Sequence, residues 1–275
     1  MAVVGPRAIR DYMPEQHRDF FGQLPFIVVG ARDDDGQPWA SLLAGRPGFC
    51  SSPDPQHLAV RAHPAPGDPL AGCLRTGAAL GLLGIEPQTR RRNRLNGVLE
   101  RVDGQGLELR VEQSFGNCPQ YIRPNGARHA DAPPAAVAQP VRGTVLDAWS
   151  QALVARADML FIASAHAGSG ADVSHRGGAP GFVRVDDART LMLPDYPGNR
   201  FFNTLGNLQV DPRAGLLFID FATGERLHVA VSADILWDGP ALADFPGAER
   251  LLRMTVHGTL RVAGGLPLHW SVAEP

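Results

Sequence analysis

The sequence predicts a mainly β protein with a few helices, in which two antiparallel β-barrels follow one another along the chain. Three observations support this fold class: an internal repeat, short apolar runs separated by glycine turns such as Asp35-Gly36 and Asp103-Gly104, and a central segment with the composition of a linker. The expected domains are residues 1–123 and 144–275, joined by a linker over 124–143.

Each half of the chain begins with a helical pattern that runs into a strand. In the first half, a helix is expected from Pro14, with Phe20, Phe21 and Leu24 on one face, and an apolar run follows over 26–31. In the second half, Thr144 is expected to cap a helix that holds Leu146, Trp149 and Leu153, and the strand-like run lies over 159–164.

Four further segments of the first half match segments of the second half in the same order. The matched pairs are 39–49 with 172–182, 81–86 with 215–220, 94–96 with 226–228, and 107–111 with 251–256. Because matches that keep their order are hard to obtain by chance, the sequence indicates a duplication. Residues 124–140 between the halves are rich in Ala, Pro and Gly, which is typical of a linker.

The composition excludes several classes of function. The net charge is -2, so no basic field attracts nucleic acid or anionic lipid. All 26 basic residues are arginines, which excludes a Schiff-base lysine and a P-loop lysine. Three scattered cysteines form neither a disulfide framework nor a zinc motif, and no metal site is expected. With no secretory leader or apolar membrane span in the pattern, a cytoplasmic location is expected.

A candidate anion site lies in the second half. The segment 198–208 suggests a helix start, with Asn203 or Thr204 as the cap. The N–H groups of a helix N-terminus bind phosphate well, and Arg176 and Arg200 would add charge-assisted hydrogen bonds. The alternative is that the glycines only form turns and that both arginines are solvated.

Three segments of the second half resemble the pyridoxamine 5'-phosphate oxidase-like FMN-binding proteins. They are Val173-Ser174-His175-Arg176-Gly177-Gly178-Ala179-Pro180-Gly181-Phe182, Gly198-Asn199-Arg200 with Thr204-Leu205-Gly206-Asn207-Leu208, and Asp211-Pro212 leading into Gly215-Leu216-Leu217-Phe218. The resemblance is close over most of 145–270 and weaker over 12–123. It implies tandem FMN-binding split barrels that form a pseudo-dimer, with FMN at the seam between them and a possible homodimer of such chains.

The resemblance also implies roles for particular residues. Ser174 and Arg176 would lie along the flavin, and Arg226 would approach from the adjacent strand. His175, between the first two, is a further candidate for binding the cofactor. The phosphate and ribityl chain would be surrounded by Asn199, Arg200, Thr204 and Asn207.

The first half departs from this pattern at the positions that would touch a cofactor. Leu70 stands where Thr204 stands, Cys73 where Asn207 stands, and Leu42-Leu43 where His175-Arg176 stand. Apolar side chains cannot hold a phosphate, so one FMN per chain is expected.

The first half keeps an arginine cluster of its own. It covers residues 90–94 and includes Arg92 and Arg94. On a strand these arginines divide between two faces, so the cluster is either a solvated edge or one face that crosses the seam towards the flavin. Asn117 and Tyr121 are further candidates for lining a pocket.

The function that follows from the resemblance is an FMN-dependent oxidoreductase that acts on an unidentified small molecule or redox partner. No catalytic residue can be assigned, because no strong acid–base constellation stands out. Other functions stay open: a non-catalytic flavin carrier, electron-transfer protein or sensor, a haem-binding split barrel with His257 or His175 as ligand, and a deazaflavin protein.

Overall fold

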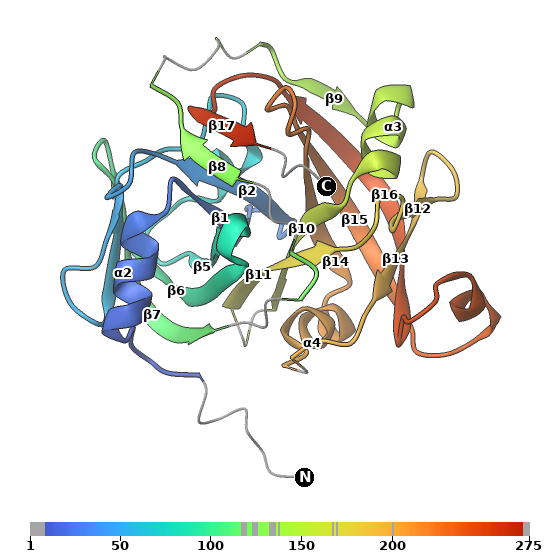
Figure 1. Cartoon of the computed structure of the whole chain (residues 1–275), viewed down its shortest axis with the longest axis horizontal. Coiled ribbons are helices and arrows are strands. Elements are labelled where there is room, and N and C mark those ends of the chain that lie inside the picture. Colours follow the sequence, from blue (N-terminus) through green and yellow to red (C-terminus); the bar gives the residue numbers. More distant parts are fainter. Residues whose placement is uncertain are drawn as a thin grey trace.

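The computed structural model describes residues 9–116, 120–122, 126–131, 136, 138–166, 168, 170–199 and 201–271 (Figure 1). Two curved antiparallel sheets, each a split β-barrel, make up most of it. The first contains β1 (Phe26–Arg32), β2 (Pro38–Ala44), β3 (Cys50–Ser51), β4 (His57–Val60), β5 (Ala79–Glu86), β6 (Arg91–Asp103) and β7 (Gly106–Gly116). The second contains β10 (Met159–His166), β11 (Gly170–Gly177), β12 (Arg184–Val185), β13 (Thr190–Asp195), β14 (Arg213–Ile219), β15 (Arg226–Leu236) and β16 (Arg250–Val262).

The two sheets have the same topology. The strand order is β2-β1-β5-β6-β7-β4-β3 in the first and β11-β10-β14-β15-β16-β13-β12 in the second, so each strand of one sheet has a counterpart at the same place in the other. The order confirms the predicted tandem pair of antiparallel barrels.

The hydrogen-bonded ladders define which residues correspond. Val29 pairs with Ser41, and its counterpart Ile162 pairs with Ser174. The predicted match of 39–49 with 172–182 is therefore confirmed at this serine. The match extends to a tight turn. There a Cβ on Gly45 would lie 2.6 Å from the Cβ of Phe49, and a Cβ on Gly178 would lie 2.6 Å from the Cβ of Phe182.

One predicted match is shifted by two residues. Leu83 pairs with Arg94, and the counterpart of Leu83, Leu217, pairs with His228. Arg94 therefore corresponds to His228, whereas the sequence match had placed it against Arg226. A shift of two residues keeps every side chain on the same face of a strand, so hydrophobic alternation alone cannot detect it.

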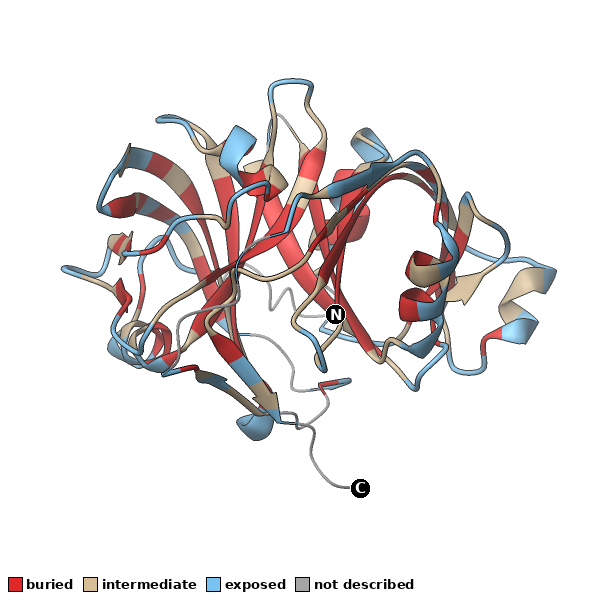
Figure 2. Cartoon of the chain, turned by 90° about the horizontal axis from the view of Figure 1, so that it is seen from above, coloured by how far each residue is buried: buried red, intermediate tan, exposed pale blue. Residues whose placement is uncertain are grey.

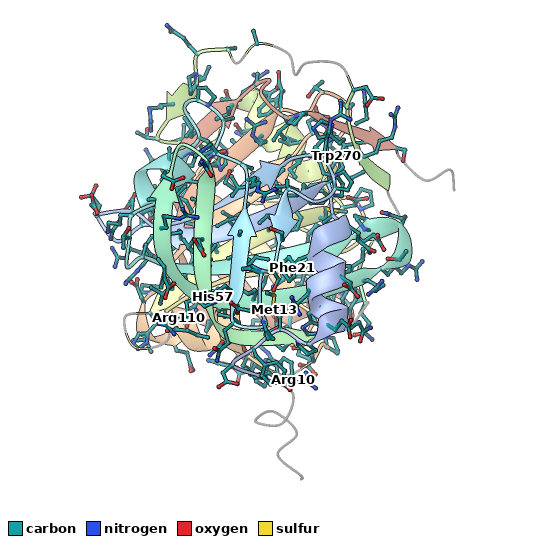
Figure 3. The ribbon with its side chains drawn as sticks, turned by 90° about the vertical axis from the view of Figure 1, so that its left-hand side faces the viewer. Arg10, Met13, Phe21, His57, Arg110 and Trp270 are labelled. Carbon is teal, nitrogen blue, oxygen red and sulfur yellow. The ribbon has the colours of Figure 1, made fainter. Side chains whose placement is uncertain are left out.

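One of the two predicted helices begins where it was expected, and the other begins later. α2 (Glu15–Gln23) follows Pro14 as expected and packs beside β3, with Phe21 turned into the first barrel (Figure 3). α3 (Ala148–Arg156) is capped by Asp147, whose side chain accepts from the N–H of Ser150, and the expected cap Thr144 lies outside the helix. The remaining helical segments are η1 (Pro69–Cys73), η2 (Pro87–Thr89), α4 (Asn203–Val210) and η3 (Pro240–Asp244).

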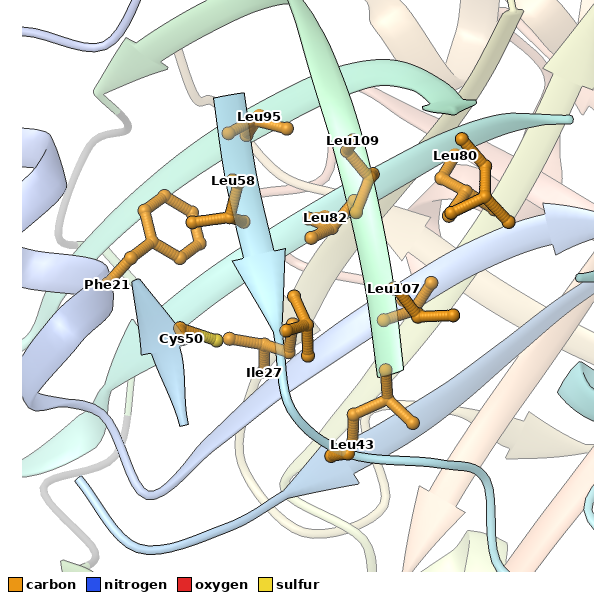
Figure 4. Packing of buried hydrophobic residues seen from close by; sticks show 14 of the residues in the cluster. Phe21, Ile27, Leu43, Cys50, Leu58, Leu80, Leu82, Leu95, Leu107 and Leu109 are labelled. Carbon is orange, nitrogen blue, oxygen red and sulfur yellow. The ribbon is translucent and has the colours of Figure 1, made fainter. Parts of the chain in front are cut away.

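Each barrel has its own apolar core. In the first, buried side chains such as Phe21, Ile27, Leu58, Leu82 and Leu109 point towards one another (Figure 4). A second cluster fills the second barrel, and a third lies between the barrels. Figure 2 shows the buried residues running through the strands of both barrels. Burial of this apolar surface is the main force that holds the barrels closed and together.

Two equivalent glycines let the barrels approach closely. A Cβ on Gly81 of β5 would lie 2.7 Å from the Cα of Asp172 in β11. A Cβ on Gly215 of β14 would lie 2.2 Å from the carbonyl oxygen of Pro38 in β2. Because no real side chain tolerates these distances, both positions require glycine, and the contacts are related by the internal pseudo-symmetry.

The described part of the expected linker contains short strands. β8 (Gly126–His129) pairs with β17 (Leu268–Ser271) near the C-terminal end, and β9 (Val141–Gly143) pairs with β16. Trp270 of β17 packs edge-on against Phe26 of the first barrel. This segment therefore binds to both barrels, which its Ala- and Pro-rich composition did not predict.

Candidate functional site

A polar pocket opens at the seam where β6 of the first barrel meets β11 and the start of α4 of the second. Seven of the residues that the sequence singled out line it together: Arg92, Arg94, Ser174, His175, Arg176, Asn199 and Thr204. The arginine cluster of the first half thus has one face that crosses the seam. The tertiary structure brings into contact residues that are 78 to 83 positions apart in the chain.

A chain of hydrogen bonds crosses the seam at the base of the pocket. Arg94 donates to Asp172 over 2.8 Å and also to the hydroxyl of Ser174. The Ser174 hydroxyl in turn lies 2.7 Å from that of Thr204 in α4. The side chains of Arg94 and Asp172 are only 12% and 4% exposed, so this pair is largely shielded from water. Such shielding strengthens an electrostatic contact and makes the loss of one partner costly.

A second contact across the seam fixes the state of a histidine. Arg92 donates from Nη1 to Nδ1 of His175 over 3.1 Å. A guanidinium has no acceptor, so Nδ1 must accept, and the imidazole is neutral with its proton on Nε2. Burial, reinforced by the charges of Arg92, Arg176 and Arg94, holds the pKa of His175 well below its ordinary value. The pocket therefore presents a neutral N–H donor at this position.

The outer part of the pocket contains an ion-pair network that the sequence did not reveal. Arg176 is bonded to Asp195, and Nη1 of Arg250 lies 3.6 Å from the same carboxylate. Arg250 is also bonded to Glu249, its neighbour in the chain. Asp195 lies in a segment already marked by its turn residues, but Glu249 and Arg250 belong to no motif, so only their position at the start of β16 brings them here.

Aromatic side chains form the remaining wall. Tyr121 stacks on Tyr196 with ring centres 5.4 Å apart and donates to the carbonyl of Pro197 over 3.1 Å. Phe202 immediately precedes α4 in the left-handed conformation, at φ 55°, and Arg250 lies over its ring. Tyr121 was expected near a pocket and lines this one, whereas its companion candidate Asn117 lies outside the described residues.

Three predicted site residues are not part of this pocket as described. Asn207 lies one helical turn deeper and donates to the Ser164 hydroxyl over 3.1 Å. Arg226 is fully buried in β15 and donates to the carbonyl oxygens of Gly224 and Gly264. The expectation that Arg226 approaches a ligand in this pocket is wrong, because its counterpart Arg92 takes that place. Arg200 lies outside the described residues.

The pocket has unused donors that suit an anionic ligand. Nε of Arg94, Nε of Arg176 and Nε2 of His175 are buried without a hydrogen-bond partner among the described residues. The start of α4 has no side-chain cap, contrary to the expected Asn203 or Thr204 cap, so its first N–H groups face the pocket's end without one. A phosphate-bearing cofactor with hydrogen-bond acceptors fits this donor set.

The positions in the first half that depart from the pattern are filled by the core. Leu42, Leu43, Leu70 and Cys73 are all buried at 2% exposure or less. No polar pocket comparable to the one at Arg94 is therefore formed by these side chains.

The described ranges contain no helix long and apolar enough to cross a membrane. They also contain no group of three or more His, Cys, Asp or Glu side chains placed to hold a metal ion. His257, one of the candidate haem ligands, bonds to Ser232 and is not among the residues that line the pocket.

Comparisons with known proteins agree with this architecture. Residues 146–265 match the family described as pyridoxamine 5'-phosphate oxidase, whereas curated protein sequences give no match. Similar solved structures include HupZ of Group A Streptococcus, at 12% identity over 44% of this chain and 99% of that chain, with a TM-score of 0.35.

Two further solved structures are similar at 11% identity and a TM-score of 0.31. An FMN-binding protein from Syntrophomonas wolfei covers 40% of this chain and 82% of its own, and HutZ, the haem storage protein of Vibrio cholerae, covers 44% and 96%. The family match over residues 146–265, and the same strand order in the first barrel, lead to one conclusion: the second barrel of this chain is a split barrel similar to the pyridoxamine 5'-phosphate oxidase family, and the first barrel repeats its topology.

Proposed function

We propose that the seam pocket binds FMN and that the protein is an FMN-dependent oxidoreductase acting on a small molecule. The observation that carries the proposal is the hydrogen-bond chain from Arg94 through Ser174 to Thr204, beside the uncapped start of α4. A phosphate monoester needs several donors and positive charge, and this end of the pocket supplies both without a lysine.

We assign the phosphate and ribityl end of FMN to Ser174, Asn199 and Thr204, together with the first N–H groups of α4. Arg92, His175 and Arg176 lie along the pocket and are assigned to the ring system. Tyr121 and Tyr196 would cover the ring from the solvent side. Arg200, which stands next to Asn199 in the sequence, remains a candidate for the phosphate from its motif alone.

FMN, when bound, supplies the redox chemistry, and the protein supplies position and electrostatics. The guanidinium groups of Arg92 and Arg176 make the potential of the pocket positive, which favours a negatively charged ring. The neutral His175 offers its Nε2 hydrogen as a donor and does not add a charge. These residues therefore orient and bias the cofactor rather than transfer protons.

A second function, a flavin carrier or electron-transfer protein without a substrate of its own, is favoured by one observation. The carboxylates at the pocket, Asp172, Asp195 and Glu249, are all engaged in ion pairs with arginines. A general acid or base must contact the substrate directly, and a carboxylate that is already bonded to an arginine is less available for that contact.

The proposal is tested by the visible spectrum of the purified protein, recorded before and after addition of FMN and then dithionite. Flavin bands that bleach on reduction, at one FMN per chain, are expected. A protein that takes up no FMN, or that shows a Soret band or a deazaflavin spectrum instead, would contradict it. Turnover of a reductant with the loaded protein then separates the oxidoreductase from the carrier.

A further inference from the structure

A second polar cluster is buried at the seam on the opposite side of the pseudo-symmetry axis. It consists of Ser41 in β2, Asp68 at the start of η1, and Arg226 and His228 in β15. Exposure is 0% for Ser41, Arg226 and His228 and 4% for Asp68, so these four polar side chains are removed from water almost completely. Charges are rarely buried to this extent unless they are paired.

The cluster is the counterpart of the seam pocket. Ser41 corresponds to Ser174 through their equal places on β2 and β11. Ile85 of β5 and Ile219 of β14 occupy equivalent places in the two sheets. Ile85 pairs with Arg92 and Ile219 pairs with Arg226, so Arg226 corresponds to Arg92. His228 corresponds to Arg94 in the same way. Arg92, Arg94 and Ser174 of the pocket therefore each have a polar counterpart here.

Asp68 is the residue that distinguishes the two places. Its carboxylate accepts from the Ser41 hydroxyl and from the N–H of Leu70 over 2.9 Å, and Nε2 of His228 lies 3.8 Å away. Asp68 immediately precedes η1, as Phe202 immediately precedes α4. At the pocket this position carries an aromatic side chain that is 45% exposed, whereas here it carries an inward-facing carboxylate.

The buried arginine needs a negative partner. Nε and Nη2 of Arg226 are buried and have no hydrogen-bond partner among the described residues, and its other contacts are neutral carbonyls. Burial lowers the pKa of Arg226, and the charge of Asp68 opposes this effect. An uncompensated buried charge would cost several kcal/mol, and within this cluster the Asp68 carboxylate is the negative charge that acts on Arg226.

We propose that the seam contains a second anion site, which the Asp68 carboxylate fills as a built-in anion. In the related seam pocket, the anion would instead come from a ligand. The comparison with a ligand rests on the proposed FMN site, but the anion site itself rests only on the buried contacts of Asp68. It follows that removal of the carboxylate creates a site for a small free anion such as formate, acetate or phosphate.

The test is chemical rescue of Asp68→Ala, followed by thermal unfolding without added FMN. In chloride buffer we expect the variant to lose about 10 °C in Tm, because the Leu70 N–H and the Ser41 hydroxyl lose their buried acceptor and Arg226 loses the negative charge of its cluster. Sodium formate, acetate or phosphate at the same ionic strength should restore several degrees. Wild-type protein and Asp147→Ala, which removes the capping carboxylate of α3 away from the seam, give the baseline for anion binding at the seam pocket, and Asp68→Ala should gain several degrees more than either. Equal melting of Asp68→Ala in all salts would overturn the proposal.

A double-mutant cycle covers the case in which Asp68→Ala does not fold. Asp68→Asn keeps the shape of the side chain and one acceptor oxygen but removes its charge, and Arg226→Met removes the cation that we couple to it. The double variant should melt higher than Asp68→Asn alone. Additive losses in Tm would show that the two charges are independent and would reject the built-in anion. Neither readout depends on FMN, so failure of the proposed function is seen separately in the spectrum.

Discussion

At the scale of single residues, the proposed FMN site depends on the hydroxyl and N–H groups at the start of α4. Thr204 shows this best, since its hydroxyl is buried, bonds to Ser174 and stands at the start of α4. A hydrogen bond to a charged group contributes about 1.5 to 3 kcal/mol, which is enough to identify a phosphate contact by substitution.

Thr204→Val keeps the shape of this side chain and removes its hydroxyl. We expect the Kd for FMN to rise by roughly 10- to 100-fold, from the loss of one charge-assisted hydrogen bond. Fluorescence titration of FMN measures the change. Thr255→Val, the same substitution at an exposed position of β16, serves as the control. An unchanged Kd in Thr204→Val would remove this residue from the phosphate site.

His175 makes a prediction about the pH dependence of stability. Its pKa is lowered by burial and by the neighbouring arginines, so below about pH 6.5 the unfolded chain binds a proton that the folded protein does not. Stability is therefore complete above that pH and falls as the pH decreases, by up to about 1.4 kcal/mol per pH unit for this residue.

Urea unfolding of wild type and His175→Gln at pH 7.5 and pH 5.0 measures this contribution. The loss of unfolding free energy on acidification should be smaller in the variant. His257→Gln, at an exposed position, should behave like wild type. Because burial also lowers the pKa of His17 and His228, part of the dependence should remain. Identical slopes in His175→Gln and wild type would argue against a neutral, buried His175.

At the scale of elements, the seam depends on strands that cross with no side chain between them. β14 contacts β2 through Gly215 in the same way that β5 contacts β11 through Gly81. Backbone cannot move aside as a flexible side chain can, so a methyl group at either position must separate the strands.

Gly215→Ala is expected to lower the free energy of unfolding by about 1 to 3 kcal/mol, because its Cβ would meet the carbonyl of Pro38. Denaturant unfolding gives the value directly. Gly104→Ala is the matched control, since a Cβ there meets no atom within 4 Å. The prediction fails if both variants are equally stable.

At the scale of the whole molecule, the duplication lets one chain supply both sides of its seam pocket. Arg92 and Arg94 come from the first barrel, and the residues they contact come from the second. The binding site is therefore complete only when the two barrels are docked, which links ligand binding to the pairing of the barrels. Whether such chains form homodimers stays a prediction, as do the domain boundaries.

Arg94→Met in the full chain tests this link. We expect FMN binding to weaken at least 10-fold and the protein to lose about 3 to 5 kcal/mol of stability, because Asp172 is left buried without its cation. Titration and urea unfolding of the same samples provide both values. Arg110→Met, at a half-exposed arginine of β7 that Figure 3 labels, should change neither by more than about 1 kcal/mol. Intact FMN binding in Arg94→Met would mean that Arg94 does not contribute to the site.

Much of this protein could be predicted from its sequence, because the responsible forces are local or repeat themselves. Alternating apolar residues and glycine turns indicate strands, and the repeat at Ser41 and Ser174 indicates a duplicated barrel. The turn residues and hydroxyls around Asn199 and Thr204 mark a site, and the leucines at 42, 43 and 70 show that its counterpart is altered.

The tertiary structure decided what depends on register and on contacts distant in sequence. A shift of two residues in β15 preserves the hydrophobic pattern but moves Arg226 from the expected pocket to the buried cluster with Asp68. The ion-pair network of Arg250, the capping of α3 by Asp147 and the strands in the Ala-rich segment also required the structure. Local pattern specifies which elements form and which face is buried, whereas the charge that meets a given arginine is set only when two barrels pack together.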